Sequence, residues 1–329
     1  HRRAAGTAAM NDWQPASGPG PAARRAAMKP RIRAYFEARH VLEVDTPMLS
    51  PYAVSDPQIE SFEITQSQVS GAPLYLHTSP EYCMKRLLAA EYPDIYSLCR
   101  VFRDGESGRV HQPEFTMLEW YRHDMGLDEI IVDTIGVIEA ALDREIEVDN
   151  VEYRDAFVAA CDVDPLTASV DALADAAGAD DALRAAVGDE RDDWLDLLLS
   201  TRVAAGFEPG RLTVLRHYPA SQAALARLCT ADAAVADRFE VFLGSVELAN
   251  GYVELTDADE QRRRIEADNE ARKRRGRPVR PVDELLLAAL DSGLPECAGV
   301  ALGIERLQML FHKTDDIGKV ITFSFREIE

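Results

Sequence analysis

The stretch at residues 100–121 constrains the fold more than any other part of the chain. An apolar run ends at Phe102, Gly105 and Gly108 supply turn residues, and a second apolar run covers residues 115–121. Two apolar runs joined by a short polar loop predict an antiparallel β-hairpin. The side chains of its loop would then project from one end of a sheet.

Charged side chains crowd this loop, which carries Arg103, Glu106, Arg109 and His111. Guanidinium groups match phosphate oxygens in a bidentate geometry, so two arginines and a histidine could clamp a polyanion. Phe115 offers an apolar face for a flat base. On composition alone, a surface hairpin with solvated charges explains the pattern equally well.

The run F-R-D-G-E-S-G-R-V-H-Q-P-E-F-T-M-L-E-W-Y resembles motif 2 of the class II aminoacyl-tRNA synthetases in its lysyl-type form, and the similarity extends from about Arg31 to about Phe325. It implies an α+β fold in which an antiparallel sheet is flanked by helices, and it implies a homodimer. The resemblance is greatest to truncated lysyl-type paralogues that attach (R)-β-lysine to elongation factor P.

Composition agrees with a globular catalytic domain. The chain has 329 residues and a net charge of -21, which disfavours general binding to nucleic acid. No apolar run reaches the ~20 residues needed to span a membrane.

Residues 1–27 are rich in Ala, Gly, Pro and Arg, so we expect a disordered start followed by a catalytic domain at residues 28–329. The scattered, odd-numbered cysteines predict a cytoplasmic protein and argue against a zinc site.

The N-terminal half contains two further candidate motifs. Residues 28–40 have helical apolar spacing and precede a short predicted strand at residues 41–48, a pair that resembles motif 1. Residues 74–87 read as a strand that enters a helix through T-S-P-E. Glu81 could simply complement the helix dipole, but in the resembled family Ser79 and Glu81 lie in the amino-acid pocket.

Helices dominate the middle of the chain. We expect one helix at residues 128–142 and a helical insertion at about residues 156–200, between the two halves of the catalytic sheet. A strand is predicted to begin at Val214.

Carboxylates mark the next segment, residues 236–257. Glu240 and Glu247 flank a glycine turn, and Glu254 follows an Asn-Gly turn. Paired carboxylates near phosphates commonly hold Mg²⁺. Three solvated hairpin carboxylates are the alternative, but E-L-A-N-G-Y-V-E-L-T-D resembles the lysyl-type pocket.

Residues 299–310, G-V-A-L-G-I-E-R-L-Q-M-L, resemble motif 3 and predict a strand followed by a helix. The resemblance assigns Arg306 to the γ-phosphate and, together with Arg103, to catalysis. It implies two further sets of contacts. ATP would be bound by Arg103, Gly105, Glu106, His111, Gln112, Phe115, Glu247, Leu248, Gly303 and Arg306, with Mg²⁺ on Glu240 and Glu247. The lysine-like substrate would be bound by Ser79, Glu81, Tyr121, Glu254 and Ala301.

Three positions depart from the family pattern. Gly105 replaces a glutamate, Gln112 replaces an asparagine, and Glu305 replaces an aspartate. Glu106 or the backbone at Gly105 would then supply the adenosine contact. Ser79 and Ala301 are the pair seen in the β-lysine enzymes, where lysyl-tRNA synthetases usually have Ala and Gly.

The basic stretch at residues 261–280 has two interpretations. A charged helix surface is preferred, and a docking patch for the acceptor protein is the alternative.

There are three hypotheses for the function. The preferred one is ATP-dependent activation of (R)-β-lysine and its transfer to a lysine of elongation factor P. A lysyl-tRNA synthetase would need an anticodon-reading barrel, for which the roughly 30 residues before motif 1 are too few. A non-catalytic regulatory paralogue has no need for Arg103, His111, Glu247 and Arg306 together, and all four are present.

Overall fold

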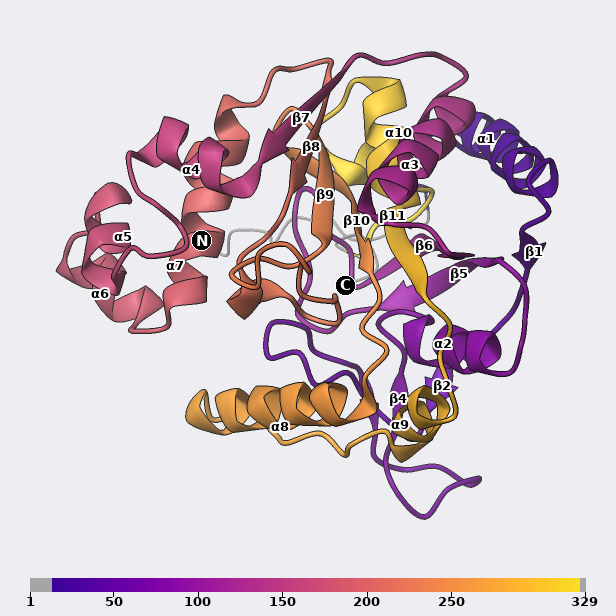
Figure 1. The fold of residues 1–329 in the computed structure, drawn as a ribbon. Helices are drawn as coiled ribbons and strands as arrows, with labels where there is room; N and C mark the ends of the chain where they lie inside the picture. The colour runs from indigo at the N-terminus through magenta and orange to yellow at the C-terminus, as the bar shows by residue number, and fades with distance from the viewer. Residues whose placement is uncertain (1–13, 326–329) are drawn as a thin grey trace, which may run out of the picture.

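A computed structural model describes residues 14–325 of the chain, and a mostly antiparallel sheet lies at its centre (Figure 1). The strand order within these residues is β1 (Leu42–Glu43), β5 (Ile95–Phe102), β6 (Glu114–His123), β11 (Cys297–Gly303), β10 (Val246–Val253), β9 (Arg238–Leu243), β8 (Leu212–Arg216) and β7 (Val148–Glu152). Only the two edge pairs, β1–β5 and β7–β8, are parallel. The predicted α+β class and the predicted hairpin, formed by β5 and β6, are confirmed.

Three helices cover one face of this sheet, namely α1 (Pro19–Glu37), α3 (Leu127–Leu142) and α10 (Ile304–His312). Alternate strand residues pack against them, including Leu118 and Trp120 of β6 and Val300 and Leu302 of β11. Successive side chains of a strand point to opposite faces, so the residues between these must face away from the helices. That second face carries the polar residues.

The start of the chain differs from the expectation of disorder through residue 27. Helix α1 begins at Pro19, and proline suits a first helical turn because its missing amide hydrogen would have no partner there. The alanines and arginines that follow favour a helix. Residues 1–13 lie outside the described residues.

The predicted strand at residues 41–48 is also shorter than expected. Only Leu42–Glu43 pairs with the main sheet, and Pro47 lies beyond that pairing. A small separate sheet has the order β2 (Leu49–Ser50), β4 (Leu74–Leu76) and β3 (Glu63–Ile64).

Between β7 and β8 the chain leaves the sheet and forms four helices, α4 (Tyr153–Cys161), α5 (Val170–Ala176), α6 (Asp181–Val187) and α7 (Arg191–Leu198). They stand at the β7 edge of the sheet (Figure 1). Tyr153, Phe157 and Trp194 are fully buried in an apolar core that this segment largely supplies itself. A π-helical turn at Leu199–Val203 and a 3₁₀ turn at Ala204–Gly206 lead back to β8.

Helices α2 (Glu81–Ala89), α8 (Ala258–Arg274) and α9 (Glu284–Asp291) pack together beside the ends of the central strands, where β5 and β11 begin and β6 ends. Short 3₁₀ turns occur at Ala220–Gln222 and Ile317–Lys319. No helix within residues 14–325 is long and apolar enough to cross a bilayer.

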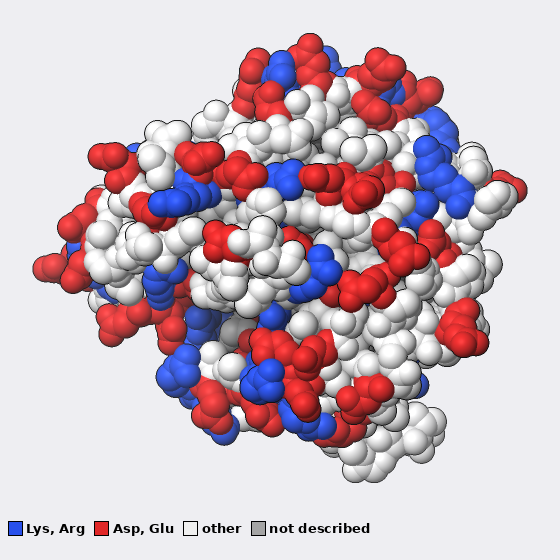
Figure 2. All heavy atoms as spheres, viewed as in Figure 1, with Lys and Arg blue, Asp and Glu red and all other residues white. Residues whose placement is uncertain are grey.

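The basic stretch at residues 261–280 forms most of α8 and the turn after it. Figure 2 shows basic side chains gathered near the end of α8 that faces the insertion. Most of them pair within the chain. Arg272 is fully buried and its Nη2 lies 2.7 Å from Glu60 Oε2, while Arg280 pairs with Glu60 and Glu63. This pairing favours a structural role for the stretch over a docking patch.

Replacing Arg272 by Ala should destabilise the fold by about 1–3 kcal/mol, because a fully buried guanidinium is lost, although Glu60 keeps its ion pair with Arg280. The change also removes donors to the carbonyl oxygens of Asp56 and Pro278. Lys273→Ala is the matched control, since its side chain is exposed and pairs only with Glu270 among the described residues. Urea unfolding of both variants measures the difference. Equal stability of the two variants would contradict the structural role.

Candidate active site

The polar face of the sheet forms the floor of a cavity of about 840 Å³. Strands β6, β9, β10 and β11 contribute alternate residues to it, and α2, α8 and the loop after β8 complete its walls. Of the predicted site residues, those on its lining are Ser79, Glu81, Arg103, Glu106, His111, Gln112, Phe115, Tyr121, Glu240, Glu247, Leu248, Glu254, Ala301, Gly303 and Arg306. The structure therefore brings together residues from distant parts of the chain.

Gly105 is the predicted site residue that lies off this lining. Its φ of +79° is in the left-handed region, where a residue with a side chain is strained. The turn geometry thus accounts for glycine at a position where the resembled family has glutamate. Its neighbour Glu106 does reach the cavity.

At one end of the cavity, Arg306 is held by two partners. Its Nη1 donates to the backbone oxygen of Glu247 at 2.9 Å and lies 3.2 Å from Glu247 Oε2, while Nη2 donates to His111 Nε2 at 2.9 Å. Burial and the charge of Arg306 lower the pKa of His111. His111 is therefore a neutral imidazole that fixes the guanidinium of Arg306.

Arg103 lies in the same region but is less completely paired. Its Cζ is 5.2 Å from the centre of the Phe115 ring, and its Nη1 lies 3.5 Å from Glu106 Oε1. Its Nε is buried without a hydrogen-bond partner among the described residues. A buried donor without a partner is costly, so this side chain is prepared for an anionic ligand.

Glu240 and Glu247 influence each other's ionisation. Burial and the charge of Glu247 raise the pKa of Glu240 to about 7, although Arg238 Nη2 lies 2.7 Å from its carboxylate. Burial also opposes ionisation of Glu247, but Arg306 and Arg103 outweigh it and leave the pKa of Glu247 below its usual range. A divalent cation would relieve the repulsion between the two carboxylates, so the pair fits Mg²⁺.

The opposite end of the cavity is built around a buried lysine. Lys85 Nζ lies 2.8 Å from Glu81 Oε1 and 2.6 Å from Glu254 Oε2. Burial alone would lower the pKa of Lys85, but the two carboxylates outweigh burial and raise it. Lys85 is therefore a fixed cation, and one helical turn separates it from Glu81 on α2.

A third carboxylate, Glu119, lies on β6. Ser79 Oγ and the hydroxyl of Tyr121 each donate to it at 2.7 Å. Burial and the charge of Glu81 raise its pKa to about 8. Burial likewise raises the pKa of Glu254 to about 8, with a further contribution from Glu81.

Lys85 and Glu119 are not among the predicted site residues, although the spacing of each from a predicted residue indicates that it faces the same site. Glu119 is two residues before Tyr121 on a strand, which places both on one face, and Lys85 is four residues after Glu81 on a helix. Tyr252, which is also not among the predicted residues, donates to Glu81 Oε1 at 2.7 Å.

Small residues on β11 leave room for these groups. A Cβ at position 299 would lie 2.4 Å from Glu254 Oε1 and 2.5 Å from Tyr121 Cε1, so only glycine fits there. Ala301 is two residues further along the same face, and its strand partners are Glu119 on β6 and Asn250 on β10.

Other predicted groups have structural roles. Gln112 Oε1 accepts a hydrogen bond from the Phe325 backbone at 2.8 Å, although Gln112 also reaches the cavity. Arg109 is exposed, pairs with Asp315 and is absent from the cavity lining. Glu305 accepts a hydrogen bond from the backbone of Thr116 at 2.9 Å and so joins α10 to β6.

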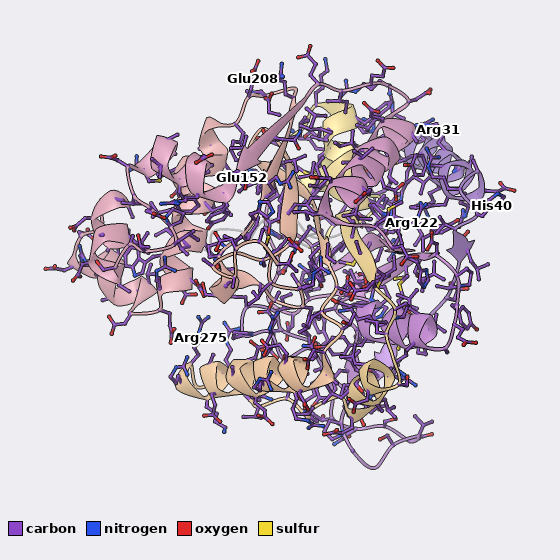
Figure 3. All side chains as sticks on the ribbon, viewed as in Figure 1. Arg31, His40, Arg122, Glu152, Glu208 and Arg275 are labelled. Carbon is purple, nitrogen blue, oxygen red and sulfur yellow. The ribbon has the colours of Figure 1, made fainter. Side chains whose placement is uncertain are left out.

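Two ion pairs connect α8 to the insertion beside the cavity. Arg274 Nη2 lies 3.1 Å from Glu190 Oε1, and Arg275 Nη2 lies 2.9 Å from Asp193 Oδ1. Figure 3 shows Arg275 reaching from α8 toward the helices of the insertion. All four residues line the cavity, so these pairs border its entrance.

Comparisons with known proteins agree with this geometry. Residues 22–327 match the family described as tRNA synthetases class II (D, K and N). A protein from Edwardsiella ictaluri named elongation factor P–(R)-β-lysine ligase is 44% identical over 319 residues, which cover 96% of this chain and 98% of that protein. Proteins of the same name from Photorhabdus laumondii and Proteus mirabilis are 43% and 44% identical, each over 95% of this chain and 97% of their own length.

Both the family match and these relatives cover nearly all of the described fold, and the cavity contains the residues that the motifs predict. The chain belongs to the class II tRNA synthetase family and, within it, to the elongation factor P–(R)-β-lysine ligases.

Proposed function

We propose that this protein uses ATP to activate (R)-β-lysine as its adenylate and then transfers the β-lysyl group to a lysine ε-amino group of elongation factor P. The ligation and its two partners, (R)-β-lysine and elongation factor P, are taken from the names of the relatives. Support from the chain itself comes from the charge of its cavity.

The proposal rests on the charge balance at the end of the cavity that is built around Lys85. Glu81, Glu119 and Glu254 contribute three negative charges when ionised, and Lys85 contributes one positive charge, which leaves two. A diamino acid carries two ammonium groups, and buried ammonium groups require carboxylate partners. An amino acid with a single ammonium group would leave one buried carboxylate without a partner.

At the other end, the arginines fit a nucleotide. Arg103, whose Nε is buried without a hydrogen-bond partner within residues 14–325, would bind both the substrate carboxylate and the α-phosphate. Arg306, oriented by His111 and Glu247, would bind the γ-phosphate, and Phe115 would pack against the adenine. Positioning and fixed positive charge are sufficient for attack of a carboxylate on a phosphoryl group.

Mg²⁺ on Glu240 and Glu247 would neutralise charge that develops on the phosphate oxygens. The carboxylate of β-lysine attacks the α-phosphorus, the bond to the β-phosphate oxygen breaks, and pyrophosphate leaves. In the second step a neutral lysine amine of the acceptor attacks the acyl carbon, the bond from that carbon to the AMP oxygen breaks, and the nitrogen loses one proton to solvent as AMP leaves. Both steps balance without an oxidant or reductant.

Two further proposals concern the setting of the enzyme. Leu42, Met48 and Leu49 are large apolar residues that remain exposed in the motif 1 region, which supports pairing of two copies there. All five cysteines are free thiols, which supports a reducing, cytoplasmic setting.

Replacing Arg103 by Ala should lower the rate of ATP–pyrophosphate exchange with (R)-β-lysine by about 10²–10³-fold, because one preorganised positive charge is lost. The matched control is Arg109→Ala, which removes an exposed arginine of the same loop that does not line the cavity. Exchange that stays near the wild-type rate in Arg103→Ala, or falls equally in Arg109→Ala, would contradict the assignment.

Replacing Ala301 by Gly should narrow or reverse a preference for (R)-β-lysine over α-lysine. The methyl group of Ala301 would occupy the place of the α-amino group of ordinary lysine, and one methyl group in a close-fitting pocket changes discrimination by about 10–200-fold. Exchange assays with each lysine isomer measure the ratio. If the wild-type protein itself prefers α-lysine, the proposed substrate is wrong.

Binding of the diamino acid should strengthen as the pH rises from 6 to 8. Glu119 has a pKa of about 8, so it carries a proton below that pH, whereas pairing with an ammonium group requires the ionised form. Binding at pH 7 should therefore release protons, which calorimetry in buffers of different ionisation enthalpy detects.

Glu119→Gln should reduce that proton release and weaken binding by about 30-fold or more. Glu208→Gln, which changes an exposed carboxylate outside the cavity, is the control. Proton release that is identical in wild type and Glu119→Gln would show that Glu119 does not lose a proton on binding and would contradict this prediction.

A further inference from the structure

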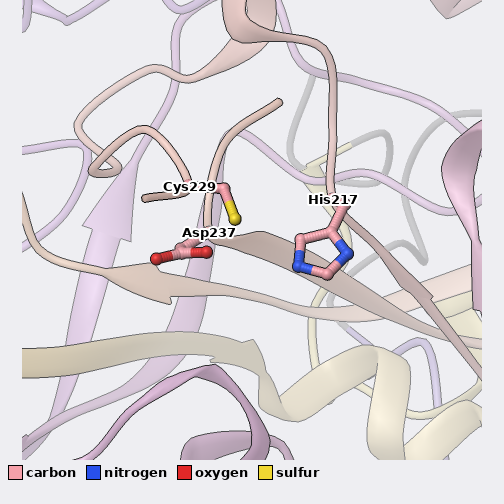
Figure 4. Close-up of side chains that lie close together, drawn as sticks. All are labelled: His217, Cys229 and Asp237. Atoms are coloured by element: carbon pink, nitrogen blue, oxygen red, sulfur yellow. The ribbon is translucent and has the colours of Figure 1, made fainter. Parts of the chain in front are cut away.

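Outside the active-site cavity, three potential metal ligands lie close together at the start of β9. They are His217, Cys229 and Asp237, and one ligand atom from each lies within 4.8 Å of the other two (Figure 4). His217 and Cys229 are partly buried and Asp237 is buried. None of the three lines the active-site cavity.

We propose that these three side chains bind one divalent transition-metal ion, for which Zn²⁺ is the test ligand. An imidazole nitrogen, a thiolate sulfur and a carboxylate oxygen are the three donor types that zinc uses in proteins. Ligand atoms around a tetrahedral zinc ion lie about 3.3–3.8 Å apart, so these side chains, whose ligand atoms lie within 4.8 Å of one another, would close by about 1 Å on binding. A water molecule would complete a tetrahedral shell.

The histidine is already oriented for this role. His217 Nδ1 lies 2.6 Å from Glu152 Oε2, so the proton of a neutral ring is held on Nδ1 and the lone pair is left on Nε2. Figure 4 shows the ring nitrogen farther from the backbone facing Cys229 and Asp237. A carboxylate that holds the outer nitrogen of a ligating histidine is a common feature of zinc sites.

The aspartate is oriented in the same way. Arg227 donates to Asp237 Oδ2 from Nε at 3.3 Å and from Nη2 at 3.0 Å. Neither of these bonds uses Oδ1, which can therefore coordinate an ion. The charge of Arg227 would oppose a nearby cation, but Glu296 Oε2 lies 3.0 Å from its Nη1 and compensates for it. The charges of Asp237, Glu152 and a Cys229 thiolate favour the ion.

Backbone pairing brings the ligands together. Asp237 N donates to Arg227 O and Cys229 N donates to Val235 O, each at 2.9 Å, so these two ligands lie on facing segments. His217 follows β8, and its backbone nitrogen donates to Arg238 O at 2.9 Å. The three ligands are of three different residue types and stand 12 and 8 positions apart in the sequence. They form no Cys-x-x-Cys pair, so a search for that pattern argued against a zinc site and could not find them.

The ion would join both ends of the loop at residues 217–237. This loop lines the active-site cavity through Ser221, Gln222 and Leu225 among others. A bound ion would therefore fix the cavity wall that faces the insertion. Since the ion would bind only the folded protein, it should raise the thermal midpoint.

The test uses the full-length protein after removal of metal by a chelator. Equilibrium dialysis should show a bound Zn²⁺ ion that is lost in Cys229→Ser and in His217→Gln. Co²⁺ should give the charge-transfer absorption of a cobalt–thiolate bond, which a carboxylate-only site such as Glu240 and Glu247 cannot produce. Glu152→Gln should weaken Zn²⁺ binding by about 10–100-fold while leaving all three ligands in place.

Cys161→Ser is the matched control, because Cys161 is also a partly buried free cysteine but ends α4 in the insertion. It should keep the metal and the absorption, and circular dichroism verifies that each variant is folded. Absence of the cobalt–thiolate absorption in the wild-type protein, or its persistence in Cys229→Ser, would overturn the proposal.

Discussion

The two faces of the antiparallel sheet impose the main constraint on this molecule. On β6, Leu118 and Trp120 pack under the helices, while Glu119 and Tyr121 face the cavity. The same alternation occurs on β9 and along most of β10 and β11, so one set of strands builds both the apolar core and the charged pocket. Leu248, beside a register shift in β10, and Val300 of β11 are exceptions that belong to both. A shift of one residue in any strand would exchange the two sets, and the fold and the site are therefore specified together.

Burying three carboxylates at the end of one pocket destabilises a fold unless each has partners. Lys85 compensates part of the charge of Glu81 and Glu254, and hydroxyl groups of Ser79 and Tyr121 satisfy Glu119. Ionising all three carboxylates at once would leave an excess of negative charge in the free protein, and the raised pKa values of Glu119 and Glu254 indicate that this is unfavourable. A dicationic ligand stabilises the ionised carboxylates in place of protons, which makes the pocket selective for diamino acids.

Much of the fold and most of the site could be predicted from the sequence, because motif residues such as Ser79, Glu81 and Arg306 stand in runs with a recognisable order. Two kinds of feature could not. Lys85 lies within a run that was read only as a helix, and its importance depends on Glu254, which is distant in sequence. Helix α1 begins before residue 28, although the proline and alanines there also suit a helix start; its first part is held by the ion pair of Arg25 with Glu305 of α10, a tertiary contact that local composition does not reveal.

The insertion is linked to the cavity through the loop after β8. Ser221 donates to Asp192 and Gln222 donates to Asp196, so α7 holds the same loop whose ends carry His217 and Asp237. Arg274 and Arg275 bind the other side of α7 to α8. The loop and the insertion also share an apolar contact, because Tyr218 at the start of the loop packs against Tyr153 in the core of the insertion. Ion pairs join α8 to the insertion. Ion pairs near a surface are weaker than packed cores and respond to salt, so the α8 side of this wall should be its more salt-sensitive part.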